Sequence, residues 1–149
     1  MDGVLNSTQS SHYYWKLKDR QTFMNDFDTV CPIACSNFQN ILENVPDLKI
    51  VISSTWRLFH EIEEWDKIAH RIPLIKGSII DKTPVLDGKQ RGDEIYFWLE
   101  KNGHLNTKYV VVDDDGDMDK VKNNFFKIDH DHGLTWKDSQ KIINHLMEE

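Results

Sequence analysis

The sequence has only two cysteines, and this scarcity limits the covalent and metal-based ways in which the chain can be stabilised. Cys31 and Cys35 lie four residues apart on a predicted helix, and no Cys/His pair at zinc-binding spacing accompanies them elsewhere. We therefore predict two buried free thiols rather than a zinc site. Thiols that stay reduced are typical of a reducing compartment, so the pattern favours a cytoplasmic protein.

Long apolar runs are missing as well. A membrane-spanning helix needs about 20 consecutive apolar residues, and no stretch of this chain approaches that length. The first residues turn polar too soon for a secretory signal. We therefore expect no membrane among the partners of this protein.

An excess of basic residues is also absent. The 18 Lys and Arg residues face 25 Asp and Glu residues, which gives a formal net charge of −7. This balance argues against a uniformly cationic nucleic-acid-binding surface, although it leaves room for a local basic patch. The chain of 149 residues shows no internal repeat and is 39% hydrophobic, so we predict one domain over residues 1–149 with a sizeable core.

Apolar runs and helical periodicity alternate along the chain. Runs at 48–52, 109–112 and 123–129 predict strands, and the first two lack the polar–apolar alternation of a half-exposed strand. Helical spacing of apolar residues predicts helices over 32–45, 58–72, 92–102 and from Thr135 onward, where Asp138 completes a sequence resembling a capping box. The alternation predicts an α/β fold: a Rossmann-like open parallel sheet with crossover helices.

Residues 5–28 do not fit this scheme. They are polar, aromatic and irregular in pattern, unlike the periodic stretches that follow. We predict a flap or small cap insertion over a site, and a plain surface loop is the alternative.

Polar side chains follow the two main predicted strands at the point where each strand ends. In open parallel sheets, ligands bind at this carboxyl edge. Clustered carboxylates repel one another unless a cation lies among them, and hard oxygen ligands favour Mg²⁺. Hydroxyl groups and a guanidinium suit phosphate oxygens. The pattern places Ser53, Ser54 and Arg57 there after the first strand and Asp113 and Asp114 after the second. Asp2 follows a stub at the start of the chain that looks like the end of a third strand.

Five stretches in this order carry a family resemblance. They are "DGVLNS", "VISSTWR", "KQRGDEIYFWL", "VVVDDDGD" and "HGLTWKD". Together they resemble the haloacid dehalogenase-like (HAD) phosphohydrolase superfamily, and more narrowly they are similar to the small HAD domains associated with RNA-repair proteins. The resemblance spans nearly the whole chain, and the ordered combination is specific where a single motif is not.

The first motif departs from the pattern of that superfamily, in which Asp-x-Asp-Gly ends the central strand. Asp2 matches the second Asp, the general acid/base, and Met1 matches the intervening residue. The nucleophilic Asp would stand one position before Met1, so the first central strand looks truncated. Either the native protein begins earlier, in an apolar run ending in Asp, or the chain is inactive and only binds. We favour the first, because losing a central strand leaves backbone groups of its neighbours unpaired.

The resemblance implies roles for the next two motifs. A hydroxyl from Ser53 or Ser54 would bind the phosphoryl group, and the choice between them stays open. A cation would offset the charge of nucleophile and phosphate; Arg91 is the first candidate for it and Lys89 the second. The short stretch 74–88 leaves room for a small cap at most, which in this superfamily implies access for bulky substrates.

The resemblance also implies a Mg²⁺ site and substrate contacts. Asp113 and Asp114 match the late acid pair and would hold Mg²⁺ together with Asp2. Arg57 and Asn6 are candidates for binding the substrate. The implied activity is a Mg²⁺-dependent phosphatase for phosphomonoesters, with nucleotides and polynucleotide 3′ ends as candidate substrates.

Two other readings stay open. One is a catalytically inactive module that binds phosphate or metal. The other is a receiver-like signalling domain, which also uses strand-end acids, but its acid pair follows the first strand, whereas here the pair comes late. In "DHDHG", His130 and His132 could bind a transition metal, but we favour an ordinary loop.

Overall fold

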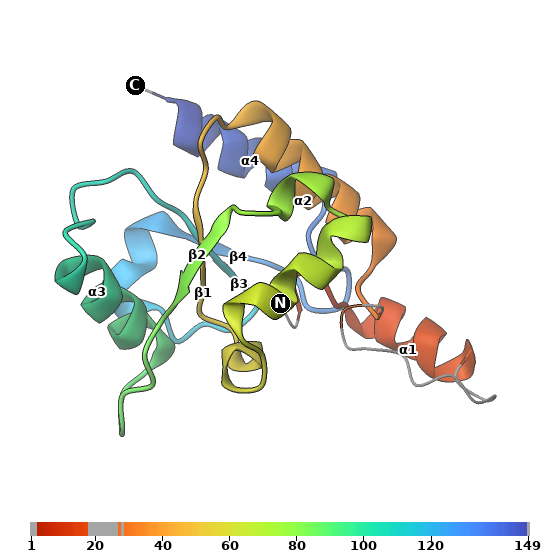
Figure 1. The fold of residues 1–149 in the computed structure, drawn as a ribbon, viewed down its shortest axis with the longest axis horizontal. Helices are drawn as coiled ribbons and strands as arrows, with labels where there is room; N and C mark the ends of the chain where they lie inside the picture. Colours follow the sequence, from red (N-terminus) through yellow and green to blue (C-terminus); the bar gives the residue numbers. More distant parts are fainter. Residues whose placement is uncertain (1–2, 18–26, 28, 149) are drawn as a thin grey trace.

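A computed structural model describes residues 3–17, 27 and 29–148, and of residues 13–17 it describes the backbone (Figure 1). No helix in this part of the chain is long and apolar enough to cross a membrane. The elements, in chain order, are α1 (Thr8–Leu17), α2 (Pro32–Asn44), β1 (Ile50–Ile52), the 3₁₀ helices η2 (Thr55–Leu58), η3 (Ile62–His70) and η4 (Pro73–Ile75), β2 (Ile79–Lys82), α3 (Arg91–Lys101), β3 (Val111–Asp113), the 3₁₀ helix η5 (Asp119–Asn124), β4 (Phe125–Lys127) and α4 (Trp136–Met147).

The predicted helices α2, α3 and α4 occur where the apolar periodicity places them. The predicted capping box at the start of α4 is confirmed, because Thr135 accepts from the Asp138 N–H while the Asp138 side chain accepts from the Thr135 N–H. The helix predicted over 58–72 is wrong in type, since the 3₁₀ helix η3 occupies most of this stretch instead. In the segment 5–28, α1 forms where an irregular flap was predicted; residues 18–26 and 28 of the flap lie outside the described residues.

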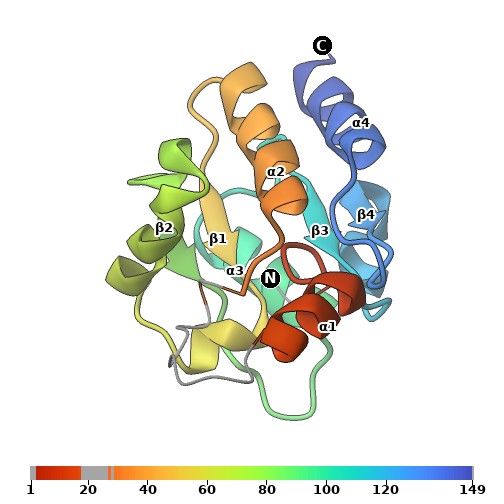
Figure 2. The ribbon, with the colours of Figure 1, turned by 90° about the vertical axis from the view of Figure 1, so that its right-hand side faces the viewer.

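The strands form two parallel pairs. β1 pairs with β2 and β3 pairs with β4, so the expected parallel pairing is confirmed for each pair. In the described part of the chain the two pairs are separate sheets, and no hydrogen-bonded ladder joins β1 to β3. A single open sheet therefore remains a prediction. Figure 2 shows the strands in the order β2, β1, β3, β4, with α2 and α4 on one side and α3 on the other.

The hydrophobic core is divided between the two sides of the strands. Because successive residues of a strand point to opposite faces, Val110 and Val112 pack against the cluster that includes α2 and α4. Val111 instead belongs to a second cluster with Ile95 and Trp98 of α3. The strands thus contribute side chains to both layers, as the non-alternating apolar runs predicted.

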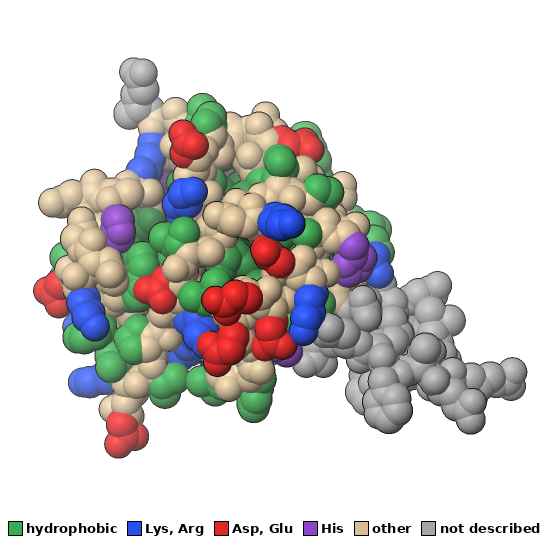
Figure 3. All heavy atoms as spheres, in the orientation of Figure 1, with side chains coloured by type: hydrophobic (Ala, Val, Ile, Leu, Met, Phe, Trp, Pro, Cys, Tyr) green, Lys and Arg blue, Asp and Glu red, His purple; other side chains and the backbone are tan. Residues whose placement is uncertain are grey.

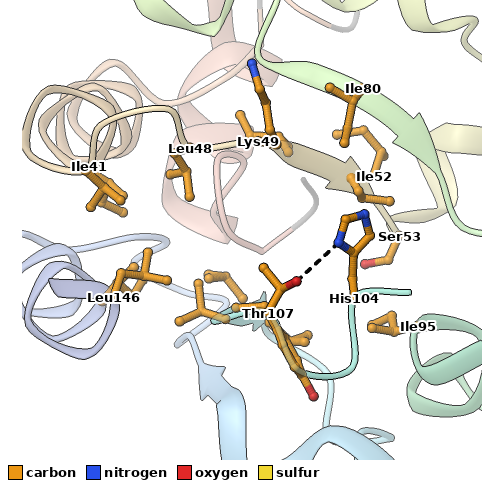
Figure 4. Close-up of a pocket in the computed structure, with 18 of the residues that line it drawn as sticks. Ile41, Leu48, Lys49, Ile52, Ser53, Ile80, Ile95, His104, Thr107 and Leu146 are labelled. Atoms are coloured by element: carbon orange, nitrogen blue, oxygen red, sulfur yellow. Dashed lines mark hydrogen bonds between the residues drawn. The ribbon is translucent and has the colours of Figure 1, made fainter. Parts of the chain in front are cut away.

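A large apolar cavity lies between the two strand pairs. Its volume is about 470 Å³, and residues of both β1 and β3 line it. Figure 4 shows Ile41 of α2, Leu146 of α4, Ile52 of β1 and Ile95 of α3 around this space.

The two thiols differ in environment, which predicts different reactivity. Both cysteines are free, and Cys35 is buried while Cys31 is half-exposed. Burial raises the pKa of the Cys35 thiol to about 12, and only the thiolate is a nucleophile. We expect a disulfide reagent at pH 8 to modify one thiol quickly and the second only after denaturation. Cys31→Ser should remove the fast phase, and a fast phase that persists in this variant would contradict the prediction.

Candidate functional site

Ser53 and Ser54 follow β1 directly, as predicted, but the two serines have different surroundings. The Ser54 hydroxyl accepts a hydrogen bond from the Trp56 N–H at 3.3 Å and caps η2. Ser54 is buried, whereas Ser53 is half-exposed. The Ser54 hydroxyl is therefore used within the fold, as is usual for a serine at a helix start.

Arg57 is buried at the centre of a polar cluster. Its guanidinium Nη2 lies 2.6 Å from Glu94 Oε2, and both side chains are at most 7% exposed. Its Nε donates to the Thr83 carbonyl at 3.2 Å, and Nη1 donates to the carbonyls of Ser53 and Ser54. Burial lowers the pKa of the guanidinium, and the Glu94 carboxylate opposes that shift. Arg57 thereby holds the ends of β1 and β2 to α3; its predicted role in substrate binding remains a prediction.

Arg91 joins the end of β1 to the end of β3. Its guanidinium donates to the Ser53 carbonyl, which also receives the bond from Arg57. Its backbone N–H donates to Asp117 Oδ2 at 3.1 Å, which attaches the start of α3 to the loop after β3. The structure thus brings together two groups that the sequence assigned to different motifs, the Ser53 loop and the Arg91 cation. Lys89, the second candidate for that cation, is exposed just before α3.

Asp113 and Asp114 stand at the carboxyl end of β3. Burial raises the pKa of the Asp113 carboxyl group, the nearby Arg91 charge lowers it, and Asp114 raises it again. The Asp115 N–H donates to Asp113 Oδ1 at 3.0 Å, which fixes that carboxyl group. Burial and a neighbouring acid both disfavour the ionised form of a carboxyl group. A divalent cation bound between the two acids would offset this electrostatic cost. Two hard oxygen donors in this setting fit the ligand preference of Mg²⁺.

Gly3 lies directly against Asp114. Its φ is +64°, and a Cβ added at this position would overlap the Asp114 carboxyl group. The backbone immediately after the Asp2 position therefore touches Asp114, the second acid of the pair at the end of β3. Met1 and Asp2 themselves lie outside the described residues, so the predicted roles of Asp2 as acid/base and metal ligand remain predictions.

The segment after Gly3 is held by the loop that precedes α4. The Leu134 N–H donates to the Val4 carbonyl at 2.8 Å, and the Thr8 N–H donates to the His130 carbonyl at 2.9 Å. A Cβ at Gly133 would come within 2.9 Å of the Val4 carbonyl oxygen, so only glycine allows this approach without displacement. The loop thereby fixes the backbone of residues 4–8, which follow Gly3. The same segment contains Asn6, the predicted substrate-binding residue, whose Oδ1 is buried and has no hydrogen-bond partner among the described residues.

The histidine loop contains a cluster that differs from the one considered from the sequence. Ligand atoms of Asp129, His130 and Asp131 lie within 4.8 Å of one another, and all three residues are exposed. His132 instead pairs with Asp129 at 3.3 Å. Asp129 also accepts the Asp131 N–H at 2.8 Å, and this hydrogen bond together with His132 lowers the pKa of the Asp129 carboxyl group. The contacts within the cluster account for its shape as a turn.

Two features of the site were not predicted from the sequence: the ion pair of Glu94 with Arg57, and the contact between Gly3 and Asp114. Glu94 stands on the buried face of α3 beside Ile95 and four residues before Trp98. An ionisable residue on an apolar face signals a buried charge that needs a partner, and this signal could have linked Glu94 with the arginine of "VISSTWR". The contact between Gly3 and Asp114 had no local signal, because it joins residues far apart in the chain.

Comparison with known proteins supports the resemblance found in the motifs. A search of curated proteins and a search of solved structures found no match. A family model described as "HAD domain in Swiss Army Knife RNA repair proteins" matches residues 1–139. Since this match covers most of the chain, the protein belongs to the family of HAD domains in Swiss Army Knife RNA repair proteins.

Proposed function

We propose that this domain is a Mg²⁺-dependent phosphatase of the HAD type that acts on phosphomonoesters, with nucleotides and polynucleotide 3′ ends as its candidate substrates. The contact between Gly3 and Asp114 is the observation that carries the proposal. It brings the first-motif backbone to the late acid pair, although the two are more than a hundred positions apart. Family membership adds support for phosphoryl chemistry.

The metal would be held by Asp113 and Asp114, with Asp2 as the third candidate ligand. Mg²⁺ bound there would offset negative charge on the phosphate and the carboxylates. The partly buried Asp113 carboxyl group supports this assignment, because burial and the neighbouring acid raise its pKa and a cation would favour its ionised form.

The catalytic steps follow from the roles that the family implies. In a form that carries the family's nucleophilic Asp one position before Met1, that Asp would attack phosphorus, and Asp2 would protonate the departing alkoxide. Asp2 then takes a proton from water, which attacks the aspartyl-phosphate and releases phosphate. Arg91 offsets the charge that gathers on the nucleophile and the phosphoryl group. The half-exposed Ser53 is the better candidate for the phosphoryl-binding hydroxyl, because the Ser54 hydroxyl caps η2.

Surface charge favours substrate ends over long nucleic-acid tracts. The face in Figure 3 carries acidic side chains among the basic ones rather than a continuous basic surface. The net charge of −7 is consistent with this distribution. A protein that binds along a nucleic acid commonly presents clustered Lys and Arg. We therefore propose that the domain recognises the terminal phosphate of its substrate. The protein residues at the candidate site, Asn6 among them, would make this contact.

The proposal predicts activity that depends on one added carboxylate. Two extended chains carry an apolar segment ahead of Met1, one ending in Asp and the matched control ending in Asn. We expect Mg²⁺-dependent release of phosphate from an aryl phosphate, and from a 3′-phosphorylated oligonucleotide, with the Asp form alone. Ser53→Ala should lower kcat/KM in the Asp form by about 100-fold, whereas Ser54→Ala should mainly lower Tm.

Two outcomes would contradict the proposal. Equal activity of the Asp and Asn forms would refute the nucleophile assignment. Phosphate binding without turnover in both forms, measured by calorimetry, would instead identify a module that only binds phosphate or metal.

A further inference from the structure

The start of α3 carries a buried acid that contacts two loops of the candidate site at once. Glu94 Oε2 lies 2.6 Å from Arg57 Nη2, and Glu94 Oε1 accepts a hydrogen bond from the Leu86 N–H at 2.9 Å. Arg57 belongs to the stretch after β1, and Leu86 belongs to the stretch after β2. Glu94 is buried, so salt and solvent screen these contacts only weakly. One carboxylate therefore ties the stretches after both strands to α3.

Arg57 in turn fixes the peptide group that follows Ser53. Its Nη1 donates to the carbonyls of Ser53 and Ser54, and its Nε donates to the Thr83 carbonyl at 3.2 Å. The N–H groups of a guanidinium lie in one rigid plane. The contact of Nη2 with Glu94 consequently sets the direction of Nη1 and Nε as well. The position of the Ser53 carbonyl thus depends on Glu94 through Arg57.

The Ser53 carbonyl is shared by two guanidinium groups, because Arg91 donates to it as well. Burial lowers the pKa of the Arg57 guanidinium, the Glu94 carboxylate raises it, and the charge of Arg91 lowers it again. The two cations therefore repel each other, and the carboxylate of Glu94 offsets this repulsion. Burial raises the pKa of the Asp113 carboxyl group and the charge of Arg91 lowers it, so Arg91 also acts on the acid pair. Glu94 thereby holds Arg57 inside the fold while Arg91 stays beside the aspartates.

We propose that Glu94 is a positioning residue of the candidate site: held between Arg57 and Leu86, it sets the place of the Ser53 carbonyl and of Arg91 without touching the substrate. The inference rests on the proposed function, since it assigns a role in phosphate binding. Its expected effect is opposite in sign to the effect of charge alone. Removing the Glu94 carboxylate makes the site more positive, which by itself would strengthen phosphate binding. Loss of the positions that Glu94 maintains would weaken it.

Calorimetric titration of inorganic phosphate into the chain of 149 residues, with Mg²⁺ present, tests the sign of the effect. We expect Glu94→Gln to raise the phosphate Kd by about 10-fold, as is typical when a residue that orients a binding group is lost. Glu100→Gln is the matched control, because it makes the same chemical change at an exposed position of α3. This control should keep the Kd of the parent.

A double variant shows whether Glu94 acts through Arg57. Arg57→Met and Glu94→Gln together should bind phosphate as weakly as Glu94→Gln alone, because both changes release the same carbonyl. The double variant leaves neither charge of the ion pair unpaired in the interior. It therefore carries the test where Glu94→Gln alone does not fold, and binding as tight as that of the parent would then overturn the inference.

The NMR signal of the Ser54 amide gives a readout that does not need phosphate. This amide nitrogen belongs to the peptide group whose oxygen accepts from Arg57 and Arg91, so its chemical shift reports those hydrogen bonds. We expect the signal to move in Glu94→Gln and to stay in place in Glu100→Gln. A signal that does not move in Glu94→Gln would overturn the inference.

The two binding outcomes that contradict the inference have different meanings. Unchanged or tighter phosphate binding by folded Glu94→Gln would limit Glu94 to a role in stability. Parent-like binding by Glu94→Gln with weaker binding by Arg57→Met would assign Arg57 a direct contact with the substrate. A parent chain that binds no phosphate, combined with a moved Ser54 signal in Glu94→Gln, would refute the proposed function and support the positioning of Ser53.

Discussion

Replacing Arg57 with alanine is expected to lower the free energy of unfolding by about 3–5 kcal/mol. The guanidinium and the Glu94 carboxylate are both buried and lie 2.6 Å apart. Removing one partner of a buried ion pair leaves an uncompensated charge in the interior, which is why the cost exceeds that of a surface pair. The variant also removes the donors that hold the Thr83 and Ser54 carbonyls. Urea denaturation followed by tryptophan fluorescence measures the change.

A double-mutant cycle separates the ion pair from other effects of the substitution. Glu94→Gln removes the charge and keeps an acceptor for the Leu86 N–H, which Glu94 Oε1 binds at 2.9 Å. Combining it with Arg57→Met should cost less than the sum of the two single changes. Lys101→Ala is the surface control, because Lys101 is exposed, and should stay within about 0.5 kcal/mol of the parent. Unchanged stability of Arg57→Ala with weakened phosphate binding would instead favour the role in substrate binding.

Replacing Gly3 with alanine is expected to weaken Mg²⁺ binding by about 10–100-fold. The new methyl group would overlap the Asp114 carboxyl group, so that side chain would have to rotate away from its present position. The positive φ of +64° adds a backbone cost of about 1–2 kcal/mol for any residue with a Cβ. The measurement is the Mg²⁺ concentration at which Tm rises halfway to its plateau.

Gly77→Ala is the matched control for this substitution. Gly77 has a similar φ of +74°, but a Cβ there would meet nothing within 4 Å. The control should lose comparable stability and keep the Mg²⁺ midpoint of the parent. Asp114→Asn should raise the midpoint as Gly3→Ala does. Equal midpoints in the two glycine variants would show that Asp114 does not take part in binding the metal.

The fold was predictable where local patterns decide the structure. The helices α2 and α4 have clear boundaries, Pro32 at one and the Thr135 cap at the other. The helix type of 58–72 was not predictable, because apolar residues three apart fit a repeat of 3.0 residues as well as one of 3.6. Strand β2 was missed because it is only four residues long and ends in Asp81 and Lys82.

The candidate site was only partly predictable, since its members come from distant segments. The rule that ligands meet the carboxyl ends of parallel strands was enough to select Ser53 and the aspartates after β3. It could not show that Arg57 points into the fold, because that depends on Glu94 of α3, 37 residues later. Side-chain direction on a helix becomes known only when the packing of that helix is known.

The hydrogen bond from the Leu134 N–H to the Val4 carbonyl has a consequence for biosynthesis. Residue 4 leaves the ribosome early, but its partner follows only after 129 further residues have been synthesised. Until then the segment that touches Asp114 lacks its support, so the edge that carries the candidate site is completed last, after translation has passed α3 and β3. Ribosome-bound intermediates arrested before residue 134 should therefore contain helical structure without a formed site.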